Sequence, residues 1–133
     1  MKIKSTSTSI VSLFLFFFLG LAIIASADSM KIAVATSGPG KDAIISQRAA
    51  RTPFFLFFDG KGNFLEALEN PFCDQSRNAG PRAAMFLADK GVTLVIAGSI
   101  GSKMEQALRD YQIEYAEQTG VAYDVVQSII KDR

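Results

Sequence analysis

The residues of this chain that could bind an anion include glycines at predicted helix starts and strand ends. Gly80 stands just before one predicted helix, and Gly98 and Gly101 stand before the next. Free backbone N–H groups and the positive end of the helix dipole meet at such positions, and glycine lets a bulky ligand approach the backbone. Each glycine taken alone is better explained as a turn residue, and only their convergence on one side of the sheet makes the two explanations equal. Together with the loop after the first predicted strand, the candidate cofactor-binding backbone residues are Ser37, Gly38, Gly40, Asn78, Gly80, Gly98 and Gly101.

Three arginines could supply positive charge to such a site. Arg48 and Arg51 lie three positions apart before a predicted strand, and Arg82 lies at the start of a predicted helix. A guanidinium group presents its N–H donors as a fork, which suits anions with several oxygen or sulfide atoms. Solvated surface charge is the alternative explanation for each arginine. We therefore treat Arg48, Arg51 and Arg82 as candidate cofactor-binding residues.

Cys73 is the only cysteine and lies in the longest predicted loop of the domain, Asn70–Gly80. A thiolate is a good ligand for a soft metal, but one thiolate cannot supply the four that an ordinary iron–sulfur cluster needs. Cys73 is therefore predicted to be a single metal anchor or a contact between two chains. A loop cysteine without a role is the alternative.

The composition argues against several catalytic chemistries. The chain contains no histidine, which excludes histidine acid–base catalysis, imidazole ligation of metals and a Ser-His-Asp triad. A two-metal nuclease needs converging carboxylates, but the predicted strand Lys31–Thr36 has none and Asp59 has no evident partner. The P-loop pattern is absent, and the near-neutral charge is not that of a general nucleic-acid binder. We expect a binding protein rather than an enzyme.

Hydrophobic patterns predict the elements that hold these residues. Strands are expected over residues 31–36, 54–59, 64–69, 92–97 and 113–116, and helices over 81–90, 102–111 and from Thr119 or Gly120 to Ile130. The turn at residues 60–63 predicts a hairpin, and Ile44 with Ile45 predicts a brief extended contact. The order β-β-β-α-β-α-β-α predicts an α/β domain. Its mixed sheet of about five strands has an antiparallel hairpin unit followed by β-α-β crossovers, and three helices cover it.

Residues 1–27 have the pattern of a signal peptide. Lys2 and Lys4 precede the apolar run Ile10–Ile24, and Ala25 and Ala27 stand before a cleavage point at Asp28. The run is shorter than the ~20 residues of a membrane span. We expect cleavage after Ala27, export to the periplasm, and a mature domain over residues 28–133 that does not contact the membrane. An uncleaved anchor helix and a cytoplasmic protein starting at Met30 are the alternatives.

A set of short motifs, in order along the chain, resembles one known family. The motifs are Met30–Thr36, Ile45-Ser46 with Arg48 and Arg51 before Pro53-Phe54-Phe55, Glu69-Asn70-Pro71, Ala79–Ala84, Gly91-Val92, and Val95–Gly98 with Gly101. Over Met30–Ile130 this set resembles the dinitrogenase iron–molybdenum cofactor biosynthesis domain family. The resemblance implies a ribonuclease-H-like fold without nuclease activity. It also implies an anionic metal–sulfur cluster as ligand, either an iron–molybdenum cofactor precursor or a molybdenum–copper sulfide.

Two features depart from that family's pattern. Some members dedicated to nitrogenase use a histidine near the cluster, and most members are cytoplasmic, whereas this chain has no histidine and carries an export signal. These two departures favour a general relative within a nitrogen-fixation-related family over a dedicated nitrogenase assembly role, and the resemblance implies that it binds or carries a metallocluster or metallo-anion without catalysis. A homodimer or a cluster-accepting protein is the expected partner. The alternative function is a ligand-free protein-interaction or regulatory domain on the same scaffold.

Overall fold

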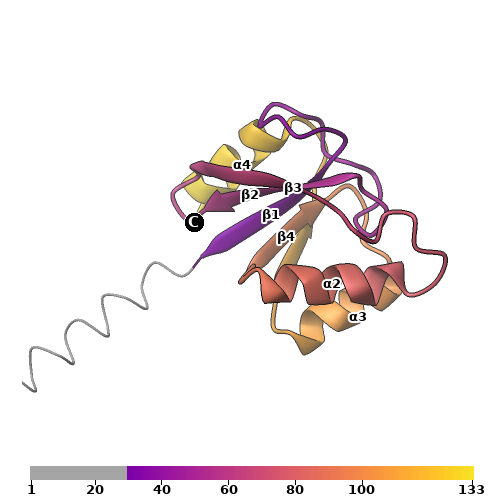
Figure 1. The fold of residues 1–133 in the computed structure, drawn as a ribbon. Helices are drawn as coiled ribbons and strands as arrows, with labels where there is room; N and C mark the ends of the chain where they lie inside the picture. The colour runs from indigo at the N-terminus through magenta and orange to yellow at the C-terminus, as the bar shows by residue number, and fades with distance from the viewer. Residues whose placement is uncertain (1–29) are drawn as a thin grey trace, which may run out of the picture.

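The computed structural model describes residues 30–133, so the predicted signal peptide lies outside the described residues. Figure 1 shows a central sheet between helices. The elements in chain order are β1 (Lys31–Thr36), β2 (Phe54–Asp59), β3 (Phe64–Glu69), α2 (Ala79–Asp89), β4 (Leu94–Ala97), α3 (Ser102–Asp110), β5 (Glu114–Glu117) and α4 (Ala122–Lys131). Within residues 30–133, no helix has the length and apolar character needed to cross a membrane.

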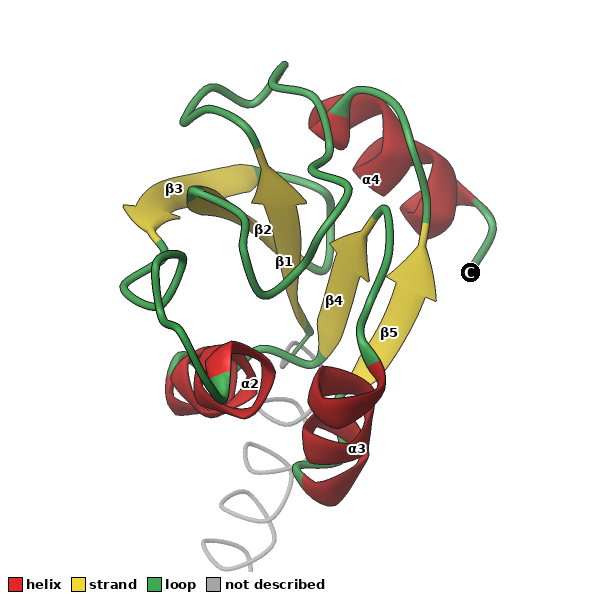
Figure 2. Ribbon diagram, turned by 90° about the vertical axis from the view of Figure 1, so that its right-hand side faces the viewer, coloured by secondary structure: helices red, strands yellow, loops and turns green. Residues whose placement is uncertain are grey.

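The five strands form one mixed sheet in the order β3-β2-β1-β4-β5 (Figure 2). β2 pairs antiparallel with both β1 and β3, whereas β4 pairs parallel with both β1 and β5. The antiparallel part of the sheet is thus β1 with the β2–β3 hairpin, and the parallel part comes from the β-α-β crossovers. The predicted α/β class, with a five-stranded mixed sheet and three helices over the described residues, is confirmed.

Several element boundaries differ from the prediction by one or two residues, and two of these shifts have clear local reasons. α2 begins at Ala79 rather than at Pro81, because a proline is tolerated in the first helical turn, where the N–H groups have no partner within the helix. β4 begins at Leu94 rather than at Val92. The Val92 amide instead donates to the Leu87 carbonyl at the end of α2, 3.1 Å away, so this residue belongs to the turn.

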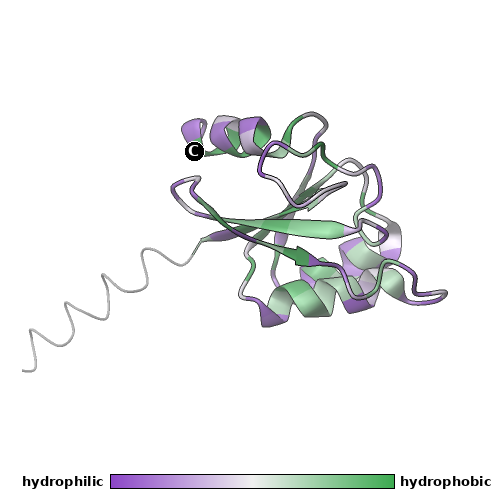
Figure 3. Cartoon of the chain, turned by 45° about the horizontal axis from the view of Figure 1, so that its top comes forward, coloured by the Kyte–Doolittle hydropathy of each residue, from purple (hydrophilic) through white to green (hydrophobic). Residues whose placement is uncertain are grey.

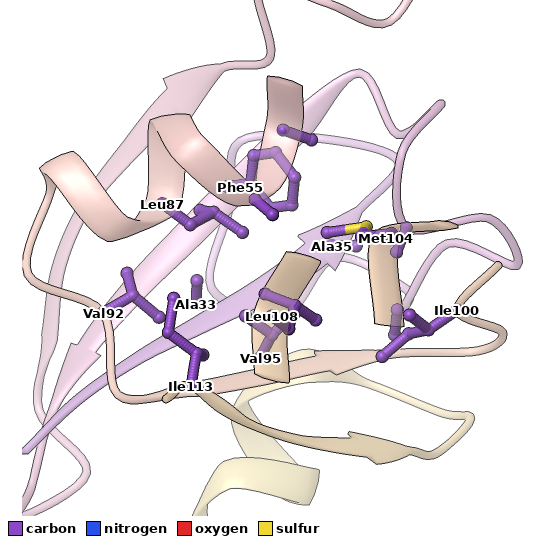
Figure 4. Packing of buried hydrophobic residues seen from close by; sticks show 14 of the residues in the cluster. Ala33, Ala35, Phe55, Leu87, Val92, Val95, Ile100, Met104, Leu108 and Ile113 are labelled. Atoms are coloured by element: carbon purple, nitrogen blue, oxygen red, sulfur yellow. The ribbon is translucent and has the colours of Figure 1, made fainter. Parts of the chain in front are cut away.

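The sheet carries a hydrophobic core on each face. Alternate strand residues point to opposite faces, so Ala33 and Phe55 pack towards α2 and α3, whereas Ile32 and Leu56 pack towards α4. Figure 3 shows the apolar sheet between these two helical layers. Figure 4 shows the side chains between the sheet and the pair α2 and α3. Strands covered on both faces are continuously apolar, which is why β1 and β4 could be recognised from the sequence.

The loops that follow β1, β3, β4 and β5 lie at the edge of the sheet formed by the C-terminal ends of these strands, because the four strands run in the same direction. In Figure 1 this edge is opposite the point where the chain enters β1. The first loop folds back on itself: Ile45 pairs with Thr36, and Ile44 pairs with Val121 at the start of α4. The brief extended contact predicted at Ile44 and Ile45 is therefore confirmed.

Candidate functional site

The first turns of α2 and α3 lie against each other at this edge. A Cβ atom on Gly80 would lie only 3.0 Å from the Cβ atom and from the backbone nitrogen of Met104. The absence of a side chain at Gly80 therefore allows the two helix starts to pack in direct contact. Each helix directs its unpaired N–H groups and the positive end of its dipole towards the same region.

Neither helix start is capped by a side chain. The N-cap of α2 is Asn78 and that of α3 is Gly101, and neither position makes a side-chain capping hydrogen bond. Asn78 is in the left-handed region, with φ 59° and ψ 27°, directly before the helical residue Ala79. Consecutive left- and right-handed residues turn their N–H groups into one concavity, an arrangement that binds anions. Both helix starts therefore present N–H groups that could donate hydrogen bonds to an anion.

A cavity of about 590 Å³ lies between these two helix starts, and we call it the helix-start pocket. Three of its lining side chains are cationic, and none is acidic: Arg51, Arg77 and Lys103. Within residues 30–133 the ion pairs are Arg109 with Glu105 and Arg133 with Glu114, none of which lines the pocket. The positive charge of the pocket is therefore not neutralised by a carboxylate of the described domain.

A second cavity of about 320 Å³ continues from the helix-start pocket. The two cavities share Ala50, Arg51 and Gly101, and the second adds Arg48 and Ser99. Arg51 also donates a hydrogen bond from Nη1 to the Gln75 carbonyl, so it links the segment before β2 to the loop after β3. The cleft formed by the two cavities thus carries four cationic side chains.

The structure brings five of the predicted cofactor-binding residues to this cleft. They are Arg48, Arg51, Asn78, Gly80 and Gly101. Arg82, by contrast, is exposed on α2 and lines none of the cavities found between these elements.

Four predicted backbone residues lie elsewhere for structural reasons. Ser37, Gly38 and Gly40 belong to the loop after β1, which is held near the start of α4 by the hydrogen bond from the Tyr123 amide to the Lys41 carbonyl, 3.0 Å long. A Cβ atom on Gly98 would lie 2.9 Å from the Cα atom of Gln47. Gly98 therefore permits the close approach of two backbone segments rather than the approach of a ligand.

Two cationic residues of the pocket were missed by the sequence analysis. Arg77 precedes the N-cap Asn78, and Lys103 is the second residue of α3. Both positions could have been found by searching for cations beside the helix starts already chosen for their glycines. Of the three predicted arginines, only Arg82 lies beside such a helix start, whereas Arg48 and Arg51 lie before a predicted strand.

Cys73 is half-buried in the loop after β3 and lines none of these cavities. Its amide donates to the Asn70 carbonyl, 3.4 Å away. Within residues 30–133, no group of three or more histidine, cysteine, aspartate or glutamate side chains is placed to hold a metal ion. The single metal anchor predicted at Cys73 is therefore not tested by the described residues, and Cys73 lies outside the helix-start pocket.

The loop between β4 and α3 is fixed by the neighbouring strand. The Ile100 amide donates to Oε2 of Glu117 at the end of β5, 2.9 Å away, and the Ile100 side chain is buried in the core beneath α2 and α3. The start of α3 is therefore anchored before any ligand binds. A preorganised set of donors avoids the free-energy penalty of ordering the loop on binding.

Comparisons with known proteins assign the chain to a family. A family model described as dinitrogenase iron-molybdenum cofactor matches residues 30–132, so the chain belongs to the dinitrogenase iron–molybdenum cofactor family, as its motifs indicated. No curated protein matches the chain.

Several solved structures share the fold. The apo form of the orange protein from Desulfovibrio gigas is 28% identical, with a TM-score of 0.73 over 77% of this chain and 88% of that chain. A candidate NifB protein from Thermotoga is 22% identical, with a TM-score of 0.67 over 78% of this chain and 90% of that chain. A candidate dinitrogenase from Methanocaldococcus jannaschii is 18% identical, with a TM-score of 0.56 over 77% and 89% of the two chains.

Proposed function

We propose that this domain binds or carries an anionic metal–sulfur cluster, or a related metallo-anion, in the helix-start pocket and does not catalyse a reaction on it. The observation that supports this function is the meeting of two uncapped helix starts in one cavity lined by three cations and no carboxylate. Membership of the dinitrogenase iron–molybdenum cofactor family supports the same class of ligand.

The pocket suits a compact anion with several acceptor atoms. Its volume of about 590 Å³ is typical of sites for small molecules and cofactors. Each helix start contributes the equivalent of about half a positive charge, and charged N–H donors make hydrogen bonds about twice as strong as neutral ones. Sulfide or oxygen atoms on the surface of a cluster could accept from Arg51, Arg77 and Lys103 together.

The absence of catalysis is part of the proposal because the pocket lacks suitable side chains. Its lining contains no histidine, aspartate, glutamate or cysteine. These residue types supply most general acids, general bases and nucleophiles in enzymes. The remaining arginine, lysine, serine and asparagine side chains bind and orient a ligand without a partner that would activate them.

The experiment is an oxygen-free titration of protein purified from cells that express the full-length sequence. The probes are tetrathiomolybdate alone and tetrathiomolybdate with Cu(I), followed by visible absorption and by metal analysis after desalting. We expect retained molybdenum in stoichiometric amount and weaker binding at high salt, since salt screens exposed charges. No retained metal with either probe would overturn the proposal and favour a ligand-free interaction domain.

A matched pair of variants locates the binding. Arg77→Ala combined with Lys103→Ala removes two cations from the pocket lining, whereas Arg82→Ala removes an exposed cation of α2 outside it. Loss of metal in the double variant but not in Arg82→Ala is the expected result. Equal binding by all three proteins would place the ligand elsewhere.

A further inference from the structure

Asn70 is one of the few buried polar residues of the described domain, with 3% of its surface exposed. It lies directly after β3, at the start of the loop that leads to α2. Its side-chain Nδ2 donates to the Ala50 carbonyl at 3.0 Å and to the Thr52 carbonyl at 2.9 Å, and its Oδ1 accepts from the Phe72 amide at 3.0 Å. The side chain thus uses both of its donor hydrogens and its acceptor oxygen.

These hydrogen bonds join two segments that are far apart in the sequence. The carbonyls of Ala50 and Thr52 belong to the residues on either side of Arg51, which lines both cavities of the cleft. The Phe72 amide belongs to the loop that ends at Arg77 and Asn78. A further backbone bond, from the Asn70 amide to the Pro53 carbonyl at 2.9 Å, fixes the same junction.

We infer that Asn70 is the positioning residue of the helix-start pocket: its amide sets where Arg51 stands relative to the loop that carries Arg77 and Asn78. Asn70 acts through these residues and does not line the pocket. The inference rests on the proposed function for the identity of the ligand. The linkage that it describes is a property of the ligand-free protein and can be measured without any ligand.

Only an amide side chain satisfies all three partners at this site. An aspartate can accept from the Phe72 amide but, when ionised, has no hydrogen to donate to the two carbonyls. A serine has one donor, and an alanine has none. Losing these donors leaves the buried hydrogen bond to the Thr52 carbonyl unmade, which is unfavourable, so the Asn70 side chain would no longer hold the segment carrying Arg51 against the loop after β3.

The alternative is that Asn70 stabilises the whole fold without a specific effect on the pocket. A matched variant distinguishes the two roles. Val126 is fully buried in the core beneath α4, on the opposite face of the sheet. We therefore expect Val126→Ala to lower the stability of the whole domain without altering the junction. Asn70→Ala is expected to loosen the junction itself.

The first measurement is amide hydrogen exchange of the ligand-free protein. In Asn70→Ala we expect the amides of Phe72, Cys73 and Gln75 to lose protection by about tenfold more than the amides of β4, because an unmade buried hydrogen bond opens the loop locally. In Val126→Ala we expect the amides of β4 to lose protection and the loop amides to keep theirs, because the loop amides exchange through local opening. Equal loss in both groups for Asn70→Ala would overturn the inference.

The second measurement uses sulfate, a probe that contains no metal, with NMR detection of Arg51, Arg77 and Lys103. We expect the sulfate dissociation constant to rise by roughly fivefold or more in Asn70→Ala, since the hydrogen-bond donors of the pocket are displaced. In Val126→Ala the constant should stay at the wild-type value. If Asn70→Ala does not fold, Asn70→Ser provides the same comparison. An unchanged constant in a folded Asn70 variant would overturn the positioning role. Sulfate binding without tetrathiomolybdate binding in the wild type would instead count against the proposed ligand class alone.

Discussion

Lys103 and Arg82 each lie in the first turns of a helix that starts at the same edge, yet only Lys103 lines the helix-start pocket. We expect Lys103→Ala to weaken tetrathiomolybdate binding by about 1.5–3 kcal/mol, roughly ten- to hundredfold, because it removes a charge-assisted contact. The free energy of unfolding should change by only about ±0.5 kcal/mol, since the side chain is exposed. Titration by visible absorption and urea unfolding measure the two quantities.

Arg82→Ala is the control for that change. It removes the same charge from the neighbouring helix, so it reports any effect of net charge alone. An equal loss of affinity in the two variants would show that long-range charge, rather than contact in the pocket, holds the ligand.

Cys73 provides a second test at the level of single residues. Because its side chain is half-buried and outside the pocket lining, we expect Cys73→Ser to bind tetrathiomolybdate within about twofold of the wild type, a change well below that of a lost hydrogen bond. Metal analysis after desalting measures retention. A large loss of retained metal would instead support the single thiolate anchor that the sequence suggested.

The sequence could identify Arg48 and Arg51 but could not separate them from Arg82. All three arginines lie near the ends of predicted elements, and the sequence pattern predicts that each of them is exposed. The arginines differ in whether they face the adjoining helix start. That orientation depends on packing between segments, such as the contact of Gly80 with Met104. The same holds for Gly98, whose close contact is with Gln47, fifty-one positions earlier in the chain.

The packing of α2 against α3 depends on one glycine, and a second glycine provides its control. A Cβ atom at Gly80 would lie 3.0 Å from Met104, whereas a Cβ atom at Gly101 would have no neighbour within 4 Å. We expect Gly80→Ala to lower the free energy of unfolding by about 1–3 kcal/mol through overpacking. Gly101→Ala should lower it by about 1 kcal/mol or less, a cost of the N-cap position rather than of packing.

Urea unfolding of both variants checks these values. If Gly80→Ala proved as stable as the wild type, the two helix starts would not be in the close contact that the pocket requires. A large destabilisation by Gly101→Ala would indicate that this position is not open.

The β2–β3 hairpin has a pH-dependent element. The Asp59 carboxylate accepts from the Asn63 amide at 2.9 Å, from the Asn63 side chain at 3.1 Å and from the Lys61 amide at 2.9 Å. The hydrogen bond from the Asn63 amide is the largest cause that holds the pKa of Asp59 below its ordinary value of 3.8. Since the folded pKa is lower than the unfolded one, the stabilising effect of Asp59 is present above about pH 4 and is lost as the pH falls through the folded pKa.

We therefore expect Asp59→Asn to unfold more easily than the wild type near neutral pH, with a difference that shrinks below about pH 4. Free energies of unfolding measured in urea across this pH range test the expectation. A difference that stays constant down to the most acidic condition would mean that the carboxylate does not stabilise the turn.

At the level of elements, the prediction succeeded where the pattern is local. Continuous apolar runs marked β1 and β4, and the turn at residues 60–63 marked the hairpin. The pattern could not show the register shift between Phe57 and Phe58, which lets Phe64 pack edge-on against Phe58 at 5.6 Å between ring centroids. It also could not show that the loop after β1 turns towards α4, because that path depends on the pairing of Ile44 with Val121.

At the scale of the whole domain, both edge strands of the sheet carry glutamates. The edge strand β3 carries Glu66 and Glu69, and the opposite edge strand β5 carries Glu114 and Glu117. Charged residues on edge strands oppose pairing between copies. The cationic cleft, by contrast, lies at the end of the sheet where the loops that follow the strands meet. The proposed ligand site is therefore positively charged, whereas the two edge strands carry negative charge.

The central claim is that the domain holds an anionic metal–sulfur cluster in the organism that makes it. The most direct measurement is metal and sulfide analysis, with an absorption spectrum, of the protein purified without oxygen from the organism that makes it. We predict bound molybdenum, iron or copper together with sulfide, released at high salt because the contacts are charged. Colourless protein that contains neither metal nor sulfide under these conditions would contradict the account.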